Sequence, residues 1–410
     1  MPDDLLQALA AARPDLGPAP DRTRRDRDLT RALASAPDAS SAPARRGRSL
    51  WKAAGLGVVA AGTAVAVIAT TGTTPPTPQS RPSETAPTPL SAREILLAAG
   101  ASSLKAPAAE GDFLYTRWIS GRQISIPGKD YLLDSRTEQE MWRAKEPGHY
   151  QYMINRDLGT ALASSAAEQA WKADGSPRGW TFETPPFEFF GMSQERGRVR
   201  VKLEPPATTP DVWRHVSDFG VGRIGSRLAT PENLAKLPTD PKALYDRLLR
   251  EMTAMTDAAP KENRPDPVQH RYLLSGDLFR AGVDLVARLP VSPALRSAAF
   301  GMLSHIPGVE SRGEMTDPLG RTGQAIALTG RADSNFVRNG EMVQGGTLYD
   351  TVLIIDPSTG TALATADQIS KPVWPPSDRQ GQWRSYELFQ ESRWIPALPM
   401  SRLKHAKHSR

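Results

Sequence analysis

Hydrophobic residues are most concentrated in one uncharged stretch near the start of the chain, from Leu50 to Thr71. No charged residue follows Lys52 until Arg81, and an apolar run of about 18 residues or more can cross a ~30 Å hydrocarbon core as a helix. The basic residues gather on the N-terminal side of the run, and they are Arg45, Arg46, Arg48 and Lys52. The positive-inside rule therefore predicts a single transmembrane helix over residues 50–71, with the N-terminus in the cytoplasm and the rest outside.

A cleaved signal peptide is the main alternative for this stretch. Signal peptides have a short basic region and an apolar core of about 7–15 residues before a small-residue cleavage site. Here about 50 residues precede a longer core, although Ala64-Val65-Ala66 has the small-residue spacing. A soluble helix that is hydrophobic on all sides is the other alternative. We favour an uncleaved signal anchor at the cell membrane.

The segments on either side of this run contain few large apolar residues. Residues 1–49 are rich in Ala, Pro, Asp and Arg, and their two short amphipathic pieces cannot bury a core alone. We predict a mostly disordered cytoplasmic tail that contacts a cytoplasmic regulatory protein through Leu5, Leu9, Leu29 and Leu33. Residues 72–90 are rich in Pro, Thr and Ser, which predicts an extended linker.

Helical patterns begin after the linker. Ser91 to Glu94 fits a capping box, and an apolar run follows, which predicts a helix from Ala92 to Leu104. Asp240 as N-cap and Pro241 at the first helical position predict a second helix. Two more are expected over residues 276–287 and 293–304.

Strand patterns occupy much of the remaining chain. Alternating apolar positions predict strands that begin at Phe113, at Tyr150 and at Val199, and residues 131–144 are assigned to strand with helix as the alternative. Residues 348–366 read as a hairpin around a Pro-Ser-Thr-Gly turn. Residues 91–400 are therefore expected to form one extracytoplasmic α+β domain with an antiparallel sheet, and residues 401–410 a basic, frayed tail.

Composition narrows the class of protein further. The 410-residue chain has a formal net charge of +6 and no cysteine, which excludes thiol catalysis and Cys-ligated zinc. About half of the positive excess lies in the first 52 residues, where orienting the membrane helix explains it. No zinc-finger, RNP or helix-turn-helix pattern follows, so we expect no nucleic-acid partner.

Candidate chemistry is sparse. The segment TFETPPFEFFGM is the most aromatic, and its phenylalanines could line a ligand groove or belong to the core. They are Phe182, Phe187, Phe189 and Phe190.

The match of residues 220–225 to G-x-G-x-x-G lacks a buried strand before it and an uninterrupted helix after it. Ser102 and Lys105 match S-x-x-K without its partner motifs, and the six histidines show no metal spacing. We predict no catalytic residue, cofactor or metal.

Three later blocks carry a family resemblance. They are LPTDPKALYDRL, PALRSAAFGMLSHIPGVESRGEMTDPLGRTGQAIAL and LYDTVLIIDPSTGTALA. They resemble an uncharacterised family of actinobacterial single-pass membrane proteins that are often encoded beside sigma factors. The resemblance implies an outer domain similar to the lipoprotein-carrier (LolA-like) type, with a curved antiparallel sheet and helices on its concave side. It implies no catalytic residues, and residues 1–49 lack the His/Cys zinc motif of many anti-sigma domains.

Two functions of different classes follow from these observations. The first is a membrane-anchored binding or sensing protein whose outer domain takes an envelope lipid, lipoprotein or protein and whose tail reports to a regulatory partner such as a sigma factor. The alternative is an envelope enzyme with an unrecognised active site. Carboxylates that converge with His215 or His270 in one pocket would favour the enzyme, and a large apolar groove would favour the binding protein.

Overall fold

The computed structural model describes the chain from residue 90 onward, with gaps. The described ranges are 90–106, 110–145, 149–184, 187–189, 192–194, 197–216, 223–224, 227–258, 267–332, 336–338, 341–343, 347–372, 378–403 and 407–408. The apolar run 50–71, the linker and the four leucines of the tail lie outside these ranges. No helix within them is long and apolar enough to cross a membrane.

The helices start where the sequence supplies caps. The Ser91 hydroxyl accepts from the Glu94 backbone N–H at 3.3 Å, and the Glu94 carboxylate accepts from the Ser91 N–H at 2.8 Å, so the predicted capping box is present. Asp240 caps the next long helix with Pro241 in its first turn, as predicted. The helices are α3 (Ala92–Ser103), α4 (Ser165–Ala173), α5 (Pro231–Ala235), α6 (Pro241–Asp257), α7 (Pro267–Val283), η2 (Asp284–Arg288), α8 (Pro293–Leu303) and α9 (Met400–Leu403).

One prediction on helix bounds was wrong. The helix expected over 276–287 begins at Pro267 as α7, and its last turn is the π-helix η2. The Leu289 N–H donates to the Asp284 carbonyl at 2.8 Å, which is the five-residue spacing of a π-helix. Pro290 follows directly and holds Leu289 in an extended conformation, so the helix ends there.

A single large sheet forms the body of the domain. Nine strands pair antiparallel and a tenth, β18, adds two residues in parallel, in the order β11-β12-β15-β16-β17-β1-β2-β3-β8-β18. The strands are β1 (Phe113–Ser125), β2 (Leu132–Ala144), β3 (Tyr150–Leu162), β8 (Asp211–Val216), β11 (Val309–Thr316), β12 (Thr322–Ala332), β15 (Leu348–Asp356), β16 (Thr361–Lys371), β17 (Trp383–Ile395) and β18 (Lys407–His408). The predicted hairpin 348–366 is β15–β16, and the assignment of 131–144 to strand is confirmed. The outer part is therefore α+β with a large antiparallel sheet.

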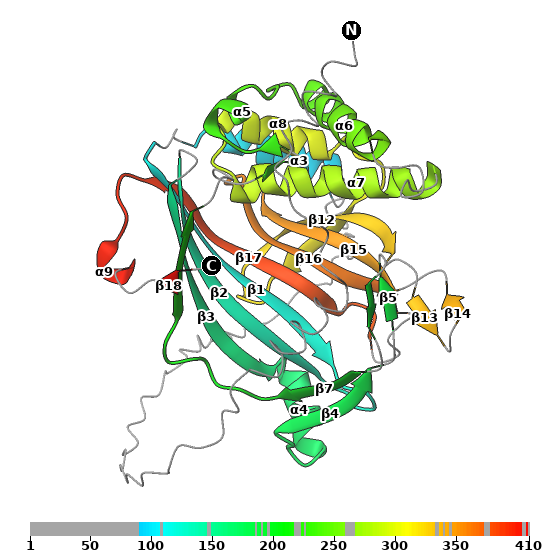
Figure 1. Cartoon of the computed structure of the whole chain (residues 1–410). Helices are drawn as coiled ribbons and strands as arrows, with labels where there is room; N and C mark the ends of the chain where they lie inside the picture. Colours follow the sequence, from blue (N-terminus) through cyan, green and yellow to red (C-terminus); the bar gives the residue numbers. More distant parts are fainter. Residues whose placement is uncertain are drawn as a thin grey trace, which may run out of the picture. The chain divides into compact units, whose positions relative to one another are not determined.

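Short two-stranded ribbons complete the described strands. They pair β4 (Gly179–Thr184) with β7 (Gly197–Lys202), β5 (Phe187–Phe189) with β6 (Met192–Gln194), β9 (Arg223–Ile224) with β10 (Arg227–Leu228), and β13 (Phe336–Arg338) with β14 (Glu341–Val343). The β4–β7 ribbon and α4 lie at the end of the sheet away from the main helices (Figure 1).

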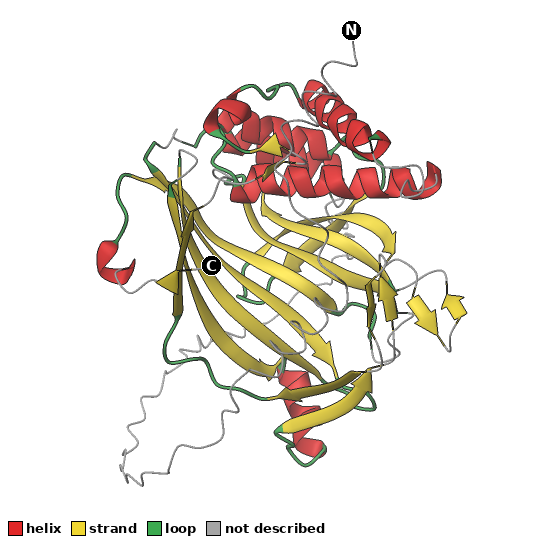
Figure 2. Cartoon of the chain, in the orientation of Figure 1, coloured by secondary structure: helices red, strands yellow, loops and turns green. Residues whose placement is uncertain are grey.

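The main core lies between the helices and one face of the sheet. Helices α3, α6, α7 and α8 gather at one end of the sheet (Figure 2), and their apolar sides pack on Ile326, Leu353 and Ile355. The opposite face of the same strands carries a second buried cluster that includes Ala364, Ala366 and other small residues. Both faces of the central strands are therefore covered, which requires polar side chains on them to find partners inside the domain.

Candidate functional site

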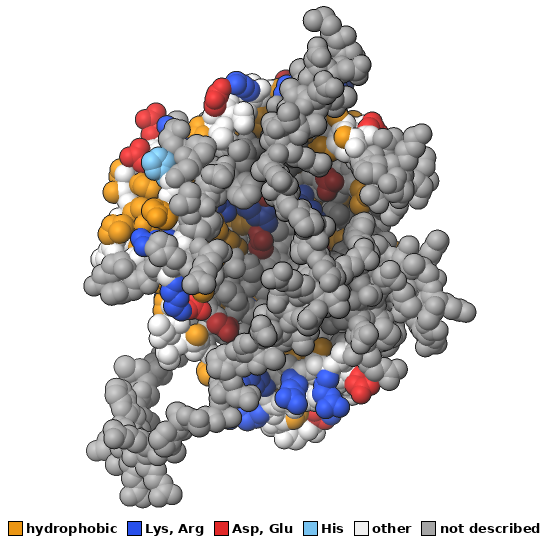
Figure 3. Space-filling model, in the orientation of Figure 1, with side chains coloured by type: hydrophobic (Ala, Val, Ile, Leu, Met, Phe, Trp, Pro, Cys, Tyr) orange, Lys and Arg blue, Asp and Glu red, His pale blue; other side chains and the backbone are white. Residues whose placement is uncertain are grey.

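Two adjoining spaces lie between the π-helical end of α7 and the sheet. The larger has a volume of about 380 Å³ and the smaller about 250 Å³. Arg288 and Glu387 line both spaces and therefore lie at their junction. The space-filling view shows a hollow below the helices in which basic and acidic side chains gather (Figure 3). Volumes of this order are typical of small-molecule sites.

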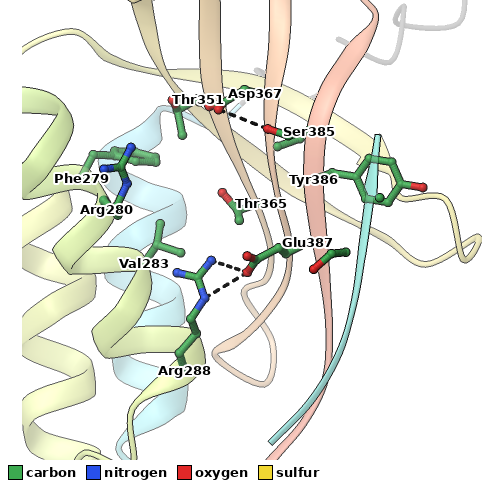
Figure 4. A pocket seen from close by; sticks show the side chains of 13 residues that line it. Phe279, Arg280, Val283, Arg288, Thr351, Thr365, Asp367, Ser385, Tyr386 and Glu387 are labelled. Carbon is green, nitrogen blue, oxygen red and sulfur yellow. Dashed lines mark hydrogen bonds and ion pairs between the residues drawn. The ribbon is translucent and has the colours of Figure 1, made fainter. Parts of the chain in front are cut away.

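Strand alternation turns polar side chains into the larger space. Thr365 of β16 and Glu387 of β17 point toward α7 and η2, while Tyr386 points to the other side of the sheet (Figure 4). Ala366 and Tyr386 belong to the buried cluster on that other face. Because neighbouring residues of a strand face opposite sides, one pattern supplies both an apolar face and a polar cavity wall.

The π-helix places one arginine between two carboxylates. Arg288 Nε donates to Glu387 Oε2 at 3.0 Å, its Nη2 also contacts that oxygen, and its Nη1 donates to Asp284 Oδ1. The Arg288 guanidinium also lies over the Phe389 ring, 5.3 Å from the ring centroid. Planar guanidinium groups favour this combination of two-point carboxylate contact and ring contact. Arg288 is therefore fixed by both η2 and β17.

Burial and charge shift the pKa values around this arginine. Burial raises the pKa of Asp284, against the opposing effect of Arg288. Burial alone would lower the pKa of Arg288, but the charges of Asp284 and Glu387 outweigh it and raise it. Burial, followed by the charge of Arg288, lowers the pKa of Arg143 to about 10. Arg143 is thus the cation whose charge this site destabilises.

The smaller space combines donors with aromatic rings. Thr116, Gln139 and Arg143 line it together with Trp118 and Phe389. Thr116 is 6% exposed, and no hydrogen-bond partner lies within reach of its hydroxyl among the residues that the structure describes. A buried hydroxyl without a partner costs free energy.

The larger space carries a carboxylate held by hydroxyls. Asp367 accepts from the Thr351 hydroxyl at 2.9 Å and from the Ser385 hydroxyl at 3.3 Å. Within the described ranges, no Lys, Arg or His forms an ion pair with this carboxylate. Arg280 also lines the space, but its side chain is 65% exposed and lies 3.9 Å from Asp277.

Of the four phenylalanines of the predicted aromatic groove, the structure describes the side chain of one. Phe182 is half-buried and packs against Tyr131 and Trp180 in a separate core cluster. Phe187 and Phe189 belong to β5, and their side chains lie outside the described part of the structure, as does Phe190. The cytoplasmic contact candidates Leu5, Leu9, Leu29 and Leu33 also lie outside it.

The described residues around the glycine motif do not form the strand–loop–helix unit that dinucleotide binding needs. Arg223 and Ile224 form β9, which pairs with the two residues of β10, and the next helix begins only at Pro231. Residues 211–216 before the motif form β8, but none of the four whose exposure is described, 211–214, is buried, in agreement with the prediction that the motif lacks a buried strand before it. In the described ranges, no three His, Asp or Glu side chains are placed to hold a metal ion.

Sequence reasoning missed the residues of both spaces. Thr116, Arg143, Asp367 and Glu387 occupy strands in which polar positions normally face solvent. One sequence feature could have pointed to the site: in β2, whose buried and less buried residues alternate, Arg143 directly follows the buried Trp142. Nothing local indicates that residues of β1, β2 and β17 would meet η2.

Comparisons with protein-family models, with curated proteins and with solved structures found no match. The functional reading of this chain therefore depends on its own residues.

Proposed function

We propose that the chain is a membrane-anchored binding or sensing protein whose outer domain takes a small ligand between η2 and the sheet. The observation that carries this proposal is the pair of adjoining spaces that share Arg288 and Glu387. Their walls combine charged groups, hydroxyls and aromatic rings, the mixture that orients a ligand and shields it from water.

The character of these walls changes the expected ligand. A long acyl chain needs an apolar groove, whereas the larger space presents Thr351, Thr365, Asp367 and Ser385. The proposal therefore shifts from a lipid to a small polar or amphipathic molecule. The curl of the sheet beneath its helices (Figure 1) supports the likeness to the lipoprotein-carrier type of domain, here with polar side chains among those that line the interior.

Membrane anchoring and signalling stay proposals that the sequence supports. The uncharged run 50–71 and its basic flank favour an anchor with residues 1–49 inside the cell. The leucines of that tail would contact a cytoplasmic regulatory protein such as a sigma factor. Reporter fusions at Gly47 and Ser91 test the topology, because a cytoplasmic signal at Ser91 would contradict it.

A cavity-filling variant tests the ligand site. Ala287 lies on η2 and lines the smaller space, so Ala287→Trp should fill it. Ala294→Trp on the exposed side of α8 is the matched control. We expect a panel of amino acids, short peptides, sugars and phosphorylated small molecules to contain compounds that raise the melting temperature of the full-length chain and the control. The same compounds should not stabilise Ala287→Trp. Equal stabilisation of both variants would refute the site.

A further inference from the structure

Six polar side chains form a grid on the sheet face that borders the larger space. Position 367 pairs with positions 351 and 385 of the neighbouring strands, and position 387 pairs with positions 365 and 120. All six line the space, and none is fully buried, so a molecule in the space can reach them. They are Ser120, Thr351, Thr365, Asp367, Ser385 and Glu387, and we call them the polar wall.

The spacing of the polar wall follows from the geometry of a sheet. Neighbouring strands lie roughly 4.8 Å apart, and every second residue of one strand lies roughly 6.6 Å along. The wall therefore offers hydrogen-bonding groups in two short rows that one small ring-shaped molecule can span.

The hydroxyl protons of the polar wall are largely used within the protein. Thr351 and Ser385 donate to Asp367 at 2.9 and 3.3 Å, and Thr365 donates to the Val352 carbonyl at 2.9 Å. A hydroxyl whose single proton is donated can only accept further hydrogen bonds. These three hydroxyl oxygens are therefore available to a ligand as acceptors.

Two carboxylates add further acceptors to the wall. The two oxygens of Asp367 each accept one hydroxyl and keep another lone pair. Arg288 contacts Oε2 of Glu387, and no described residue donates to Oε1 of that carboxylate. A ligand in this space must therefore bring several hydrogen-bond donors of its own.

Carboxylates and guanidinium groups line the larger space in equal number. Asp367 and Glu387 supply the carboxylates, and Arg280 and Arg288 supply the guanidinium groups. Asp284 makes a further contact with Arg288 from η2. The residues that line the space thus carry no surplus of either charge, which favours a neutral ligand over an ion. The arginines also supply donors for the oxygens of such a ligand.

We propose that the larger space binds a neutral molecule with several hydroxyl groups on one ring, of the monosaccharide class. This inference rests on the proposed function and specifies its ligand. Figure 4 shows Thr365 and Glu387 on the sheet side of the space, across from Arg280 on α7. Hydroxyls suit both sides, because each donates one hydrogen bond to the polar wall and accepts others from an arginine.

Calorimetric titration of the full-length chain with a sugar panel tests this inference. The panel contains glucose, galactose, mannose and arabinose, together with deoxyfluoro derivatives in which fluorine replaces one hydroxyl at a time. Fluorine is close to a hydroxyl in size but cannot donate. We expect at least one sugar to bind, and at least one of its derivatives to bind about tenfold more weakly, equivalent to about 1.4 kcal/mol. Glucosamine and glucuronate, which carry a charge, should bind no more tightly than the best neutral sugar.

Three variants assign the binding to the polar wall. Asp367→Asn keeps the shape but replaces an acceptor oxygen with a donor, and it should weaken binding about tenfold. Ser385→Ala removes one hydroxyl that holds Asp367 and should weaken binding severalfold. Glu314→Gln, on the exposed side of β11, is the matched control and should bind as the unaltered chain does. The fluorine comparison uses the unaltered chain, so it stands even if a variant fails to fold.

Absence of binding by every neutral sugar at tens of millimolar would overturn the inference. Tighter binding of a charged analogue, equal binding of every fluorinated derivative, or unchanged binding by Asp367→Asn would also overturn it. If other compounds still raise the melting temperature of the chain and lose this effect in Ala287→Trp, the ligand site survives and only its ligand class fails. If no compound of either kind binds, the site itself fails.

Discussion

Removal of the unpartnered hydroxyl of Thr116 is predicted to stabilise the folded protein. Thr116 is 6% exposed, and its hydroxyl has no hydrogen-bond partner among the described residues. Leaving such a group buried costs about 1–3 kcal/mol. Thr116→Val keeps the shape and removes the hydroxyl, so we expect the free energy of unfolding to rise by about 1 kcal/mol. Most substitutions at buried positions lower it.

A second threonine in the same region is the matched control. The Thr365 hydroxyl donates to the Val352 carbonyl at 2.9 Å, so Thr365→Val should lower the free energy of unfolding by about 0.5–1.5 kcal/mol. Urea unfolding of both variants, followed by tryptophan fluorescence, measures the difference. A loss of stability in Thr116→Val as large as that in Thr365→Val would show that the Thr116 hydroxyl is satisfied.

Two other predictions concern a turn and the C-terminal segment. Gly360 has φ +70°, and a Cβ there would lie 2.5 Å from the main chain of α3, whereas Gly381 has φ +81° with nothing within 4 Å. Gly381→Ala should therefore cost only the ~1–2 kcal/mol of left-handed strain, and urea unfolding should show that Gly360→Ala costs more. Equal losses of stability would refute the close approach at Gly360. Burial alone would raise the pKa of Glu140, but hydrogen bonds from Arg402 and Tyr115 outweigh it and lower the pKa. The ionised Glu140 therefore stabilises the folded protein above the carboxyl's unfolded pKa, and this stabilisation is lost as pH falls through the lower folded value. Proteolysis of the C-terminal segment should therefore accelerate in that acidic range. In Glu140→Gln the same segment should already be cleaved at neutral pH as fast as in the acidified unaltered chain. A cleavage rate of the unaltered chain that does not change with pH would contradict this.

Local signals in the sequence were sufficient for many of the elements. The capping box at Ser91, the Asp240–Pro241 start of α6 and the turn between β15 and β16 each depend on residues within a few positions of one another. Such signals act in the same way wherever the segment lies in the fold. The antiparallel α+β class followed from them.

The cavity could not be predicted because long-range pairing creates it. Strand β1 pairs with β17 across more than 250 residues of chain, which brings Thr116 and Glu387 to one face. The alternation in β16 and β17 indicated a polar face, but not that α7 and η2 would cover it. The π-helical turn, which directs Arg288 to the junction, has no sequence signal that we recognised. The residues that line the candidate site are therefore the ones that local sequence patterns predict least well.

The central claim, that the two adjoining spaces between η2 and the sheet take a small ligand, can be measured directly because the chain has no cysteine. Gln139→Cys places a thiol in the smaller space, Thr365→Cys one in the larger, and Ser358→Cys one in an exposed turn as reference. Each full-length variant is labelled with methyl methanethiosulfonate, with and without a compound that raises the melting temperature of the unaltered chain. We predict that the compound slows labelling at positions 139 and 365 and leaves labelling at position 358 unchanged. Labelling that the compound leaves unchanged at all three positions would contradict the account.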